Sequence, residues 1–391
     1  MTKRPIDFSK LRPETRLALA GRDPARHEGA VNPAVHHATT VVIDDVTDLY
    51  NTPKKTYALE GMAIQDALCE ALIGLEGGAS ASLAPSGLSA CTLAILAIAR
   101  ADAELLVTDS AYGPTRRFCD KVLRRFGVKP RYYDPRIGAG IAELITEKTC
   151  GVFLESPGSL SFEIQDVPAI TAAARAKGAP TIIDNTWSAG IFFKPFDHGV
   201  DLSIQALTKY QGGHADAFMG AVLSATPEWA TRVRTTYKEL GLGAGPDDAY
   251  LVLRGMRSLA VRLERQSASA LRVAHWLAQR PEVARVLHPA LPDFADNALW
   301  KRDFTGASGV FSFVLKPAPP ERLTAMLESL AIFSMGFSWG GYESLIVPCD
   351  AQIIRTAKPW RAEGPLIRLS IGLEHAEDLI ADLEHGLGLL N

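Results

Sequence analysis

The sequence predicts an α/β protein in which a large domain with a mostly parallel sheet is followed by a smaller α+β domain. Between about residues 56 and 240, helical patterns alternate with short β-branched runs, and this alternation is typical of parallel sheets covered by helices. The glycine-rich segment Gly241–Pro246 then breaks the alternation, and the strands and helices after it follow a different order. We therefore expect a second domain to begin there.

Three parts follow from this pattern. Residues 1–55 mix charges, prolines and short apolar pieces without a sustained period, so we expect an extended arm that needs another surface to pack on. Residues 56–245 are expected to form the large domain, and residues 246–391 the small one.

Local patterns place the main elements. Ala63–Leu75 carries apolar residues on one face and predicts a helix. A second, alanine-rich helix is expected at Val167–Lys177, and Gly178 is expected to end it. Short apolar runs predict strands of the large domain at Leu105–Asp109, Gly151–Glu155 and Thr181–Asp184. The small domain is expected to hold a long helical stretch, two strands and two further helices, at Ala249–Arg280, Gly309–Leu315, Leu366–Ile371, 320–330 and 376–387.

The composition is that of an ordinary soluble globular protein. Of 391 residues, 47% are hydrophobic and 22% charged, and a net charge of −3 without a basic run argues against a nucleic-acid partner. The five cysteines lack CxxC spacing, no apolar stretch could span a bilayer, and the start lacks the apolar region of a signal peptide. No histidine, cysteine or carboxylate cluster has metal-ligand spacing. We expect a cytoplasmic protein without a metal, membrane or nucleic-acid partner.

Two residues carry the first functional hypothesis. Asp184 ends the strand Thr181–Asp184, and a carboxylate at the carboxyl end of a buried parallel strand lies where open α/β sheets bind ligands. Lys209 follows a second short apolar stretch and precedes a Gly-Gly turn. Such a pair suits pyridoxal phosphate (PLP), because the amine forms a Schiff base and the carboxylate keeps the pyridine nitrogen protonated. Taken alone, the pair is more often a solvated lysine and a helix cap.

A short glycine motif favours the cofactor site. Ser86 and Gly87 open the apolar helix expected at Ala90–Ala99, and free N–H groups at a helix start can bind phosphate. No GxxxxGK[ST] motif occurs, and the glycines within 241–245 lack the strand–turn–helix context of a dinucleotide site, so we interpret them as a linker. Combined with Lys209 and Asp184, Gly87 becomes the expected phosphate anchor.

Several longer motifs are specific enough to compare with known families. They are Asp109-Ser-Ala-Tyr112, Glu155-Ser-Pro157, Asp184-Asn-Thr-Trp187, Ala206-Leu-Thr-Lys209-Tyr210, Ser338-Trp-Gly-Gly-Tyr-Glu343-Ser-Leu345 and Ile367-Arg368-Leu369. With these motifs the chain resembles the Cys/Met-metabolism PLP-dependent enzymes from about Gly29 to His385. The resemblance implies the PLP-dependent transferase fold of type I. It also implies a homotetramer built as a dimer of dimers, with the arm reaching a neighbouring subunit.

The resemblance implies a role for each matching residue at the cofactor. Lys209 is the implied Schiff-base lysine, Asp184 the partner of the pyridine nitrogen, and Tyr112 the aromatic side chain that stacks on the ring. The implied phosphate contacts are Gly87, Leu88, Thr208 and, from the neighbouring subunit, Tyr57.

The same resemblance implies a site for a small sulfur amino acid. Arg368 is the implied ligand of the substrate α-carboxylate, a bidentate role that suits a guanidinium better than an ammonium. Ser338 and Trp339 are expected to flank it.

Two positions depart from the family pattern. Leu59 stands where the family usually has an arginine, and Ala206 stands where a serine is frequent. Each change removes a contact with the cofactor phosphate. Lys54, Lys55 or an arginine from elsewhere could supply the lost charge. We expect PLP to bind, with a weaker hold on its phosphate.

The expected reaction is cleavage of a carbon–sulfur bond at the β-carbon. Trp187 and the Trp339/Tyr342 pair resemble the β-lyase subgroup, which cleaves L-cystathionine to L-homocysteine, pyruvate and ammonia in methionine biosynthesis. Lys209 is expected to remove the Cα proton, and either Lys209 or Tyr112 to protonate the leaving thiolate. Two alternatives stay open. One is a γ-acting relative (cystathionine γ-synthase, cystathionine γ-lyase or methionine γ-lyase), and the other is a catalytically silent PLP-binding protein.

Overall fold

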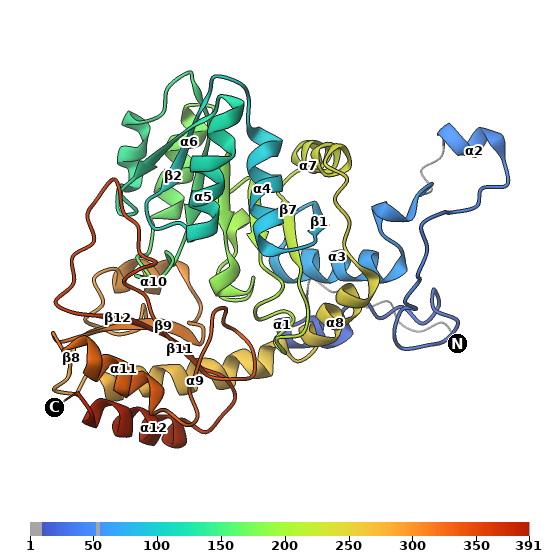
Figure 1. The fold of residues 1–391 in the computed structure, drawn as a ribbon. Coiled ribbons are helices and arrows are strands. Elements are labelled where there is room, and N and C mark those ends of the chain that lie inside the picture. The colour runs from blue at the N-terminus through green and yellow to red at the C-terminus, as the bar shows by residue number, and fades with distance from the viewer. Residues whose placement is uncertain (1–9, 52–54, 391) are drawn as a thin grey trace.

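The computed structural model describes residues 10–51 and 55–390, and two separate sheets organise it (Figure 1). The seven strands of the large sheet are β1 (Ser80–Ala84), β2 (Glu104–Thr108), β3 (Lys129–Tyr133), β4 (Thr149–Glu155), β5 (Thr181–Asp184), β6 (Leu202–Gln205) and β7 (Gly220–Ser224). The five strands of the small sheet are β8 (Val283–Leu287), β9 (Val310–Leu315), β10 (Ser334–Met335), β11 (Leu345–Pro348) and β12 (Leu366–Ser370).

The large sheet is mostly parallel, as predicted. Its order is β1-β7-β6-β5-β4-β2-β3, with parallel pairing at every step from β6 to β3. Strand β7 runs antiparallel to both β6 and β1. Because parallel strands end at the same edge, the carboxyl ends of β4, β5 and β6 lie side by side. Open α/β sheets bind their ligands at this edge.

The strands of the large sheet are buried on both faces, which explains their nearly continuous apolar sequences. In β4, Phe153 belongs to the core on one face, whereas Val152 and Leu154 belong to the core on the other. This alternation follows the two-residue period of a strand. Helices α4 (Gly87–Ile98) and α7 (Pro227–Glu239) cover the first face, and α6 (Val167–Ala176) covers the second.

Nine further α-helices lie in the described ranges of the chain. They are α1 (Pro13–Leu19), α2 (Val46–Asn51), α3 (Ala63–Glu76), α5 (Gly113–Lys121), α8 (Pro246–Met256), α9 (Leu259–Leu277), α10 (Asn297–Asp303), α11 (Pro320–Glu328) and α12 (Ala376–Gly388). Within the described ranges, none of these helices is long and apolar enough to cross a membrane.

The prediction of one long helical stretch at Ala249–Arg280 was wrong, because the chain turns between α8 and α9. Helix α8 packs on α3, whereas α9 packs on the small sheet and on α12. The carbonyl of Gly255, freed at the break, accepts hydrogen bonds from Ser258 Oγ at 3.2 Å and Arg262 Nη2 at 2.8 Å. No proline marks this break in the sequence. The chain breaks there because the two helices pack on different parts of the molecule.

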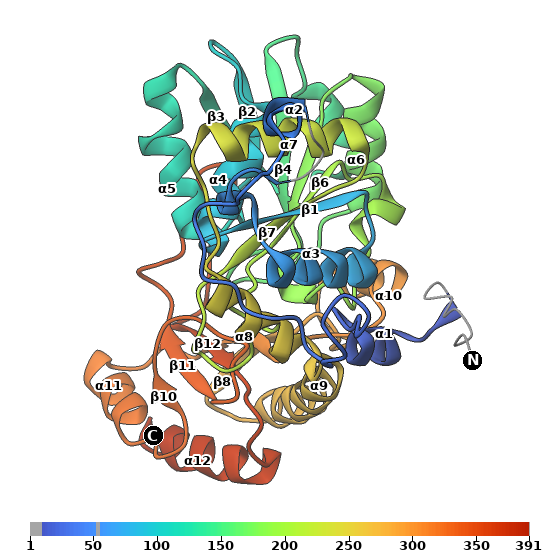
Figure 2. The same ribbon diagram turned by 90° about the vertical axis from the view of Figure 1, so that its right-hand side faces the viewer.

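Part of the N-terminal arm packs on its own chain. Helix α1 contacts α3 and α9, and Leu17 and Ala20 are buried in the core beneath them. Further along, α2 stands out from the body of the molecule (Figures 1 and 2). Val42, Val46 and Tyr50 around it are 83%, 77% and 85% exposed, which is unusual for apolar side chains in a folded chain.

Gly255 provides a test of the packing between α8 and the turn after Lys209. A Cβ added at Gly255 would lie 2.2 Å from Gln211 O and 2.3 Å from Gly212 O, both backbone atoms. We predict that Gly255→Ala lowers the stability of the protein by about 2 kcal/mol or more, measured as a fall in Tm by circular dichroism.

Gly74 offers a matched control, because it lies within α3, is exposed, and has no atom within 4 Å of an added Cβ. Gly74→Ala should raise stability by about 0.5–1 kcal/mol, since alanine is the better helix former. Equal melting temperatures for the two variants would contradict the packing described here.

Candidate active site

A cavity of about 370 Å³ lies where the carboxyl edge of the large sheet meets the small domain. Nine of the ten predicted site residues line it, and they are Gly87, Leu88, Tyr112, Asp184, Thr208, Lys209, Ser338, Trp339 and Arg368. These residues are spread over more than 280 positions of the sequence, from 87 to 368. Only the fold brings them together.

Lys209 lies in the turn that follows β6. Its Nζ donates a hydrogen bond to Ser338 Oγ at 2.6 Å and lies 5.2 Å from the centroid of the Trp339 ring. Burial lowers the pKa of Lys209 to about 8, and the positive charge of Arg368 acts in the same direction, against the opposing effect of Asp184. An amine with this pKa is partly neutral near neutral pH, so it can act as a nucleophile or a base.

Asp184 ends β5 and is held by the residue two positions later. Its Oδ1 accepts hydrogen bonds from Thr186 N at 3.1 Å and Thr186 Oγ1 at 2.5 Å. Its Oδ2 lies 3.8 Å from Cys91 Sγ, a weak donor, and so keeps acceptor capacity for a stronger one. Burial raises the pKa of Asp184, and the Thr186 hydrogen bonds and the Lys209 charge oppose that rise.

A second buried carboxylate, Glu76 at the end of α3, lies behind these two residues. It is 4% exposed and accepts hydrogen bonds from Gln205 Nε2 at 2.6 Å, Asn185 Nδ2 at 3.1 Å and Ser203 Oγ. The pKa of Glu76 is raised, because burial outweighs these three hydrogen bonds and the charge of Lys194. The three donors satisfy the hydrogen-bonding capacity of this buried side chain.

The Glu76 network sets the spacing of the two predicted cofactor residues. Asn185 directly follows Asp184, and Gln205 ends β6 four residues before Lys209. Glu76 therefore ties the end of β5 to the end of β6 through side chains. We infer that Glu76 positions Asp184 and Lys209 relative to each other without lining the cavity.

Arg368, on β12, lines the cavity and has one unpaired donor. Its Nη2 donates to Ser338 O at 2.8 Å, while its Nε is buried with no partner in the described chain. The side chain is 8% exposed, and burial lowers its pKa. A buried guanidinium with a free N–H is suited to bind a carboxylate from a ligand. Ser338 has a φ of +79°, a strained backbone angle for a non-glycine residue.

Tyr112 is held by an acidic residue that the sequence analysis did not assign. Tyr112 N donates to Glu155 Oε2 at 2.7 Å, and the tyrosine side chain remains 43% exposed at the cavity. Glu155 ends β4 directly beside Asp184 on β5. Burial and the neighbouring Asp184 charge raise the pKa of Glu155 well above its usual value. Its position at a strand end, the argument used for Asp184, could have identified it.

The helix start predicted to hold a phosphate has the expected form. Ser86 caps α4, its Oγ accepting from Ser89 N at 3.1 Å, and the N–H groups of Gly87 and Leu88 have no acceptor within the described ranges. A Cβ at Gly87 would lie 2.6 Å from Ala206 Cβ, so both positions need small residues. The Thr208 hydroxyl is bonded to the Met219 backbone.

Tyr57 is the predicted site residue that does not line this cavity. It is 52% exposed and pairs through its backbone with Thr40 in the arm. Lys55, one candidate to replace the missing arginine, forms an ion pair with Asp66 at 2.5 Å in its own chain. Lys54, the other, lies outside the described residues. Leu59 packs near Gly243.

Apolar side chains complete the lining. Phe218 and Phe337 are 73% and 77% exposed, although both line the cavity. Further lining residues that the sequence analysis did not single out come from one segment, and they are Pro157, Gly158, Ser159, Leu160 and Phe162. Scattered apolar residues in loops carry no local signal of a shared cavity, so only the structure reveals them.

Comparison with known proteins places these residues in a family. The description "Cys/Met metabolism PLP-dependent enzyme" matches residues 14–388. The chain is 48% identical to a putative cystathionine β-lyase of Rhizobium johnstonii, covering 95% of each chain. It is 43% identical to cystathionine β-lyase MetC of Escherichia coli, covering 95% of this chain and 97% of the relative.

Solved structures share the fold. A cystathionine γ-synthase of Xanthomonas oryzae pv. oryzae in complex with cystathionine superposes with a TM-score of 0.89 at 31% identity. The match covers 97% of this chain and 98% of that one. The predicted type I fold is confirmed by this likeness and by the family match.

The pKa of Lys209 can be tested through cofactor capture. In cofactor-free protein, only the neutral amine reacts with an aldehyde, so the rate of PLP capture should rise with pH and level off above about 8. An unperturbed lysine would continue to rise toward its ordinary pKa of 10.5. Stopped-flow absorbance at several pH values measures this rate.

The matched variant is Arg368→Met, which removes the positive charge near Lys209. Its midpoint should move to higher pH, because less repulsion opposes protonation of the amine. A wild-type midpoint near 10.5 would show that Lys209 is solvated.

Proposed function

We propose, on the premise that this chain belongs to the Cys/Met metabolism PLP-dependent enzyme family, that it is a carbon–sulfur β-lyase acting on L-cystathionine. The products are L-homocysteine, pyruvate and ammonia. One observation carries the proposal. A lysine amine, a strand-end carboxylate and a buried arginine with a free donor converge on one cavity in a chain 43–48% identical to β-lyases.

The cavity suits PLP by its own geometry. The open N–H groups at Gly87 and Leu88 supply a phosphate cradle, and Gly87 allows the close approach of Ala206 beside it, because an added Cβ would lie 2.6 Å from Ala206 Cβ. Lys209 would hold the cofactor covalently through Nζ, with Asp184 as the acidic partner of its ring nitrogen and Tyr112 stacked on its ring. Bound PLP supplies an electron sink for the negative charge that forms at the substrate α-carbon.

Substrate binding and proton removal are assigned to two basic side chains, Arg368 and the neutral form of Lys209. Arg368 would bind the α-carboxylate through its guanidinium, while the Ser338 carbonyl accepts a hydrogen bond from its Nη2. The Lys209 amine would remove the Cα proton as a general base. Its lowered pKa makes the neutral form available for this step.

Cleavage of the Cβ–sulfur bond needs a proton for the leaving thiolate. Lys209, which has just taken the Cα proton, and Tyr112 both line the cavity and are the two candidate donors. The remaining three-carbon unit reacts with water to give pyruvate and ammonia. In total, one water is consumed for each L-cystathionine cleaved, and no oxidant or reductant is needed.

The γ-acting alternative rests on the shared fold. The γ-synthase of Xanthomonas oryzae superposes along nearly the whole chain, so the architecture alone does not choose between β- and γ-cleavage. Its identity of 31% is lower than the 43–48% to the β-lyases, which favours β-cleavage. Trp187 and Trp339 line the cavity, consistent with the predicted subgroup, whereas Tyr342 does not.

The proposal includes a homotetramer, a dimer of dimers, in the cytoplasm. The exposed apolar residues around α2 and the position of Tyr57 away from its own chain's cavity support an arm that reaches a neighbouring subunit. We propose that Tyr57 contacts the cofactor phosphate of that subunit. The domain limits near residues 55 and 245 remain part of the same proposal.

The products test the reaction type. Purified protein incubated with PLP and L-cystathionine should form pyruvate and L-homocysteine, measured by keto-acid chromatography. Production of 2-oxobutyrate instead would assign the chain to the γ-eliminating branch, and formation of neither would favour a silent PLP-binding protein. In Lys209→Ala, the cofactor absorbance band at about 420 nm should be lost, because the side chain that bonds covalently to PLP is removed. Turnover should fall by about a thousandfold, because the general base is removed as well.

Complementation tests the role of Tyr57. Tyr57→Ala and Lys209→Ala chains should each be impaired alone. Co-expressed, they should recover about a quarter of wild-type activity, because half of the dimers then contain one intact shared site. Co-expression of Lys209→Ala with a chain that carries both substitutions is the control and should recover nothing. If the mixed sample recovers nothing either, Tyr57 does not act across the subunit boundary.

A further inference from the structure

A loop of the small domain contacts the large domain beside the segment that carries Tyr112. The chain between β11 and β12 rises from the small sheet toward the carboxyl edge of the large one (Figure 1). Strand β12 carries Arg368, so this loop belongs to the domain that is proposed to bind the substrate carboxylate. We call residues 355–358 the clasp, and residues 109–112 of the large domain the Tyr112 loop.

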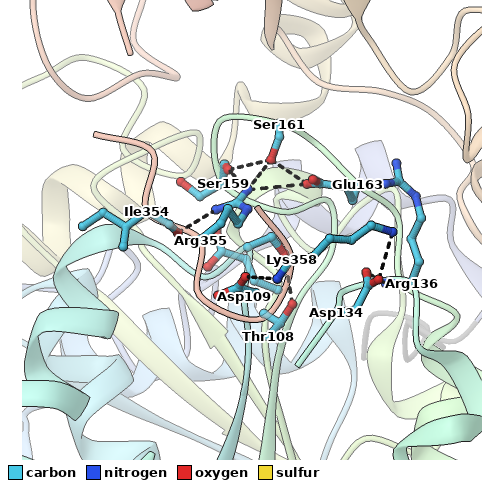
Figure 3. A network of polar contacts seen from close by, with 12 residues as sticks. Thr108, Asp109, Asp134, Arg136, Ser159, Ser161, Glu163, Ile354, Arg355 and Lys358 are labelled. Carbon is cyan, nitrogen blue, oxygen red and sulfur yellow. Dashed lines mark hydrogen bonds and ion pairs between the residues drawn. The ribbon is translucent and has the colours of Figure 1, made fainter. Parts of the chain in front are cut away.

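Asp109 is the residue of the Tyr112 loop that binds the clasp. It directly follows β2, and its side chain is fully buried. The carboxylate accepts hydrogen bonds from the N–H groups of Thr356, Ala357 and Lys358 at 2.8 to 3.1 Å (Figure 3). It also accepts from Thr356 Oγ1 at 3.0 Å and from Arg116 Nη1 at 2.8 Å. Four of these five donor atoms come from the small domain.

Asp109 binds the clasp as an anion. Burial acts to raise its pKa, but the hydrogen bonds from Thr356, Lys358, Arg116 and Ala357 outweigh burial and lower the pKa below its usual value. Hydrogen bonds to a charged acceptor are stronger than neutral ones, and a buried carboxylate that lost these donors would be costly. The positions of Asp109 and of the clasp are therefore fixed together.

Two side chains attach the clasp to other parts of the large domain. The buried Arg355 donates from Nη2 to Ser161 Oγ (Figure 3). Lys358 Nζ forms an ion pair with Asp134 at 3.0 Å, and its side chain is exposed. Asp109 is the residue through which hydrogen bonds join the clasp to the Tyr112 loop.

Arg116 connects Asp109 to Tyr112. Its Nη1 donates to both the carboxylate and the carbonyl of Asp109, at 2.8 and 3.0 Å, and its Nη2 donates to Thr356 Oγ1 at 3.1 Å. Its backbone N–H donates to Tyr112 O at 3.1 Å at the start of α5. The guanidinium is buried, with its Cζ 3.7 Å from the centroid of the Tyr132 ring. These bonds close residues 109–116 into one unit that contains Tyr112.

The backbone of Tyr112 decides where its ring can lie. The side chain lines the cavity but stays partly exposed, so packing alone does not fix it. A side chain adopts only a few rotamers relative to its own backbone. The Tyr112 N–H is held by Glu155 Oε2 at 2.7 Å, and its carbonyl by Arg116 N. A shift of residues 109–116 would therefore move the ring.

We propose that Asp109 is a positioning residue through which the small domain sets the position of Tyr112 at the cofactor ring. This inference rests on the proposed function for the stacking role of Tyr112. Asp109 does not line the cavity and takes no part in the chemistry. Because the loop that contains the clasp continues into β12, the same contact relates the position of Tyr112 to that of Arg368.

PLP binding in three variants tests the proposal. Asp109→Asn keeps the shape of the side chain and removes its charge, so the dissociation constant for PLP should rise about fivefold. Thr356→Val removes two hydrogen bonds at an exposed residue, where folding is at little risk, and should raise the constant about threefold. Thr356→Ser keeps the hydroxyl and should match the wild type. Ultrafiltration of the loaded protein over a dilution series measures the constant.

Lys358→Ala is the matched control within the clasp. It removes an exposed ion pair with Asp134 and keeps the backbone N–H that donates to Asp109, so PLP binding should not change. If Asp109→Asn does not fold, the comparison of Thr356→Val with Thr356→Ser and Lys358→Ala decides.

A double-mutant cycle separates an effect through Tyr112 from a general loss of stability. Tyr112→Ala should raise the dissociation constant for PLP about tenfold. Thr356→Val added to Tyr112→Ala should raise it no further, because the ring that the clasp positions is already absent. Hydrogen exchange followed by mass spectrometry should show faster exchange in residues 109–116 for Asp109→Asn and Thr356→Val, and not for Lys358→Ala.

Two results would overturn the inference. If the effects of Thr356→Val and Tyr112→Ala multiply in the double variant, the clasp acts on PLP by a route other than Tyr112. Unchanged exchange in residues 109–116 would mean that the clasp does not hold the Tyr112 loop. If Tyr112→Ala binds PLP as tightly as the wild type, the proposed role of Tyr112 fails separately. The exchange comparison does not depend on that role and still decides whether the clasp holds the loop.

Discussion

The geometry of the candidate active site depends on a buried carboxylate that takes no part in the chemistry. Glu76 ends α3 and accepts hydrogen bonds from Asn185 at the end of β5 and from Gln205 at the end of β6. A buried carboxyl group without such partners would be costly, so these hydrogen bonds stabilise the arrangement in which the donors stay in place. The neighbouring residues Asp184 and Lys209 then stay in place with them. A folding requirement and a catalytic requirement are met by the same contacts.

The cavity also brings together basic and acidic side chains whose charged forms are disfavoured by burial. Two basic side chains, Lys209 and Arg368, and two carboxyl groups, Asp184 and Glu155, line the same cavity. Burial lowers the pKa of both cations and raises the pKa of both carboxylates. The shift of Lys209 brings its pKa to about 8, which suits a group that must both give and take a proton.

Neither domain carries the site alone. Lys209 and Asp184 come from the large sheet, whereas Arg368 and Ser338 come from the small domain, and Lys209 Nζ meets Ser338 Oγ across the boundary at 2.6 Å. The loop between β11 and β12 supplies a second connection, because its Thr356 and Ala357 N–H groups donate to Asp109. The relative position of the two domains is therefore part of the site, and contacts remote from the cavity can alter its shape.

The sequence by itself determined the fold class and most of the residues at the cofactor. Asp184 at a strand end and Gly87 at a helix start are local patterns, and a few neighbouring residues suffice to recognise them. The motif around Lys209 and its resemblance to a family extended this prediction to Arg368. Only the tertiary structure placed Glu155 beside Asp184, ended α8 before α9, and brought Arg355 against Ser161. These features join residues up to about two hundred positions apart, and burial, which decides their energies and pKa values, exists only once the chain has packed.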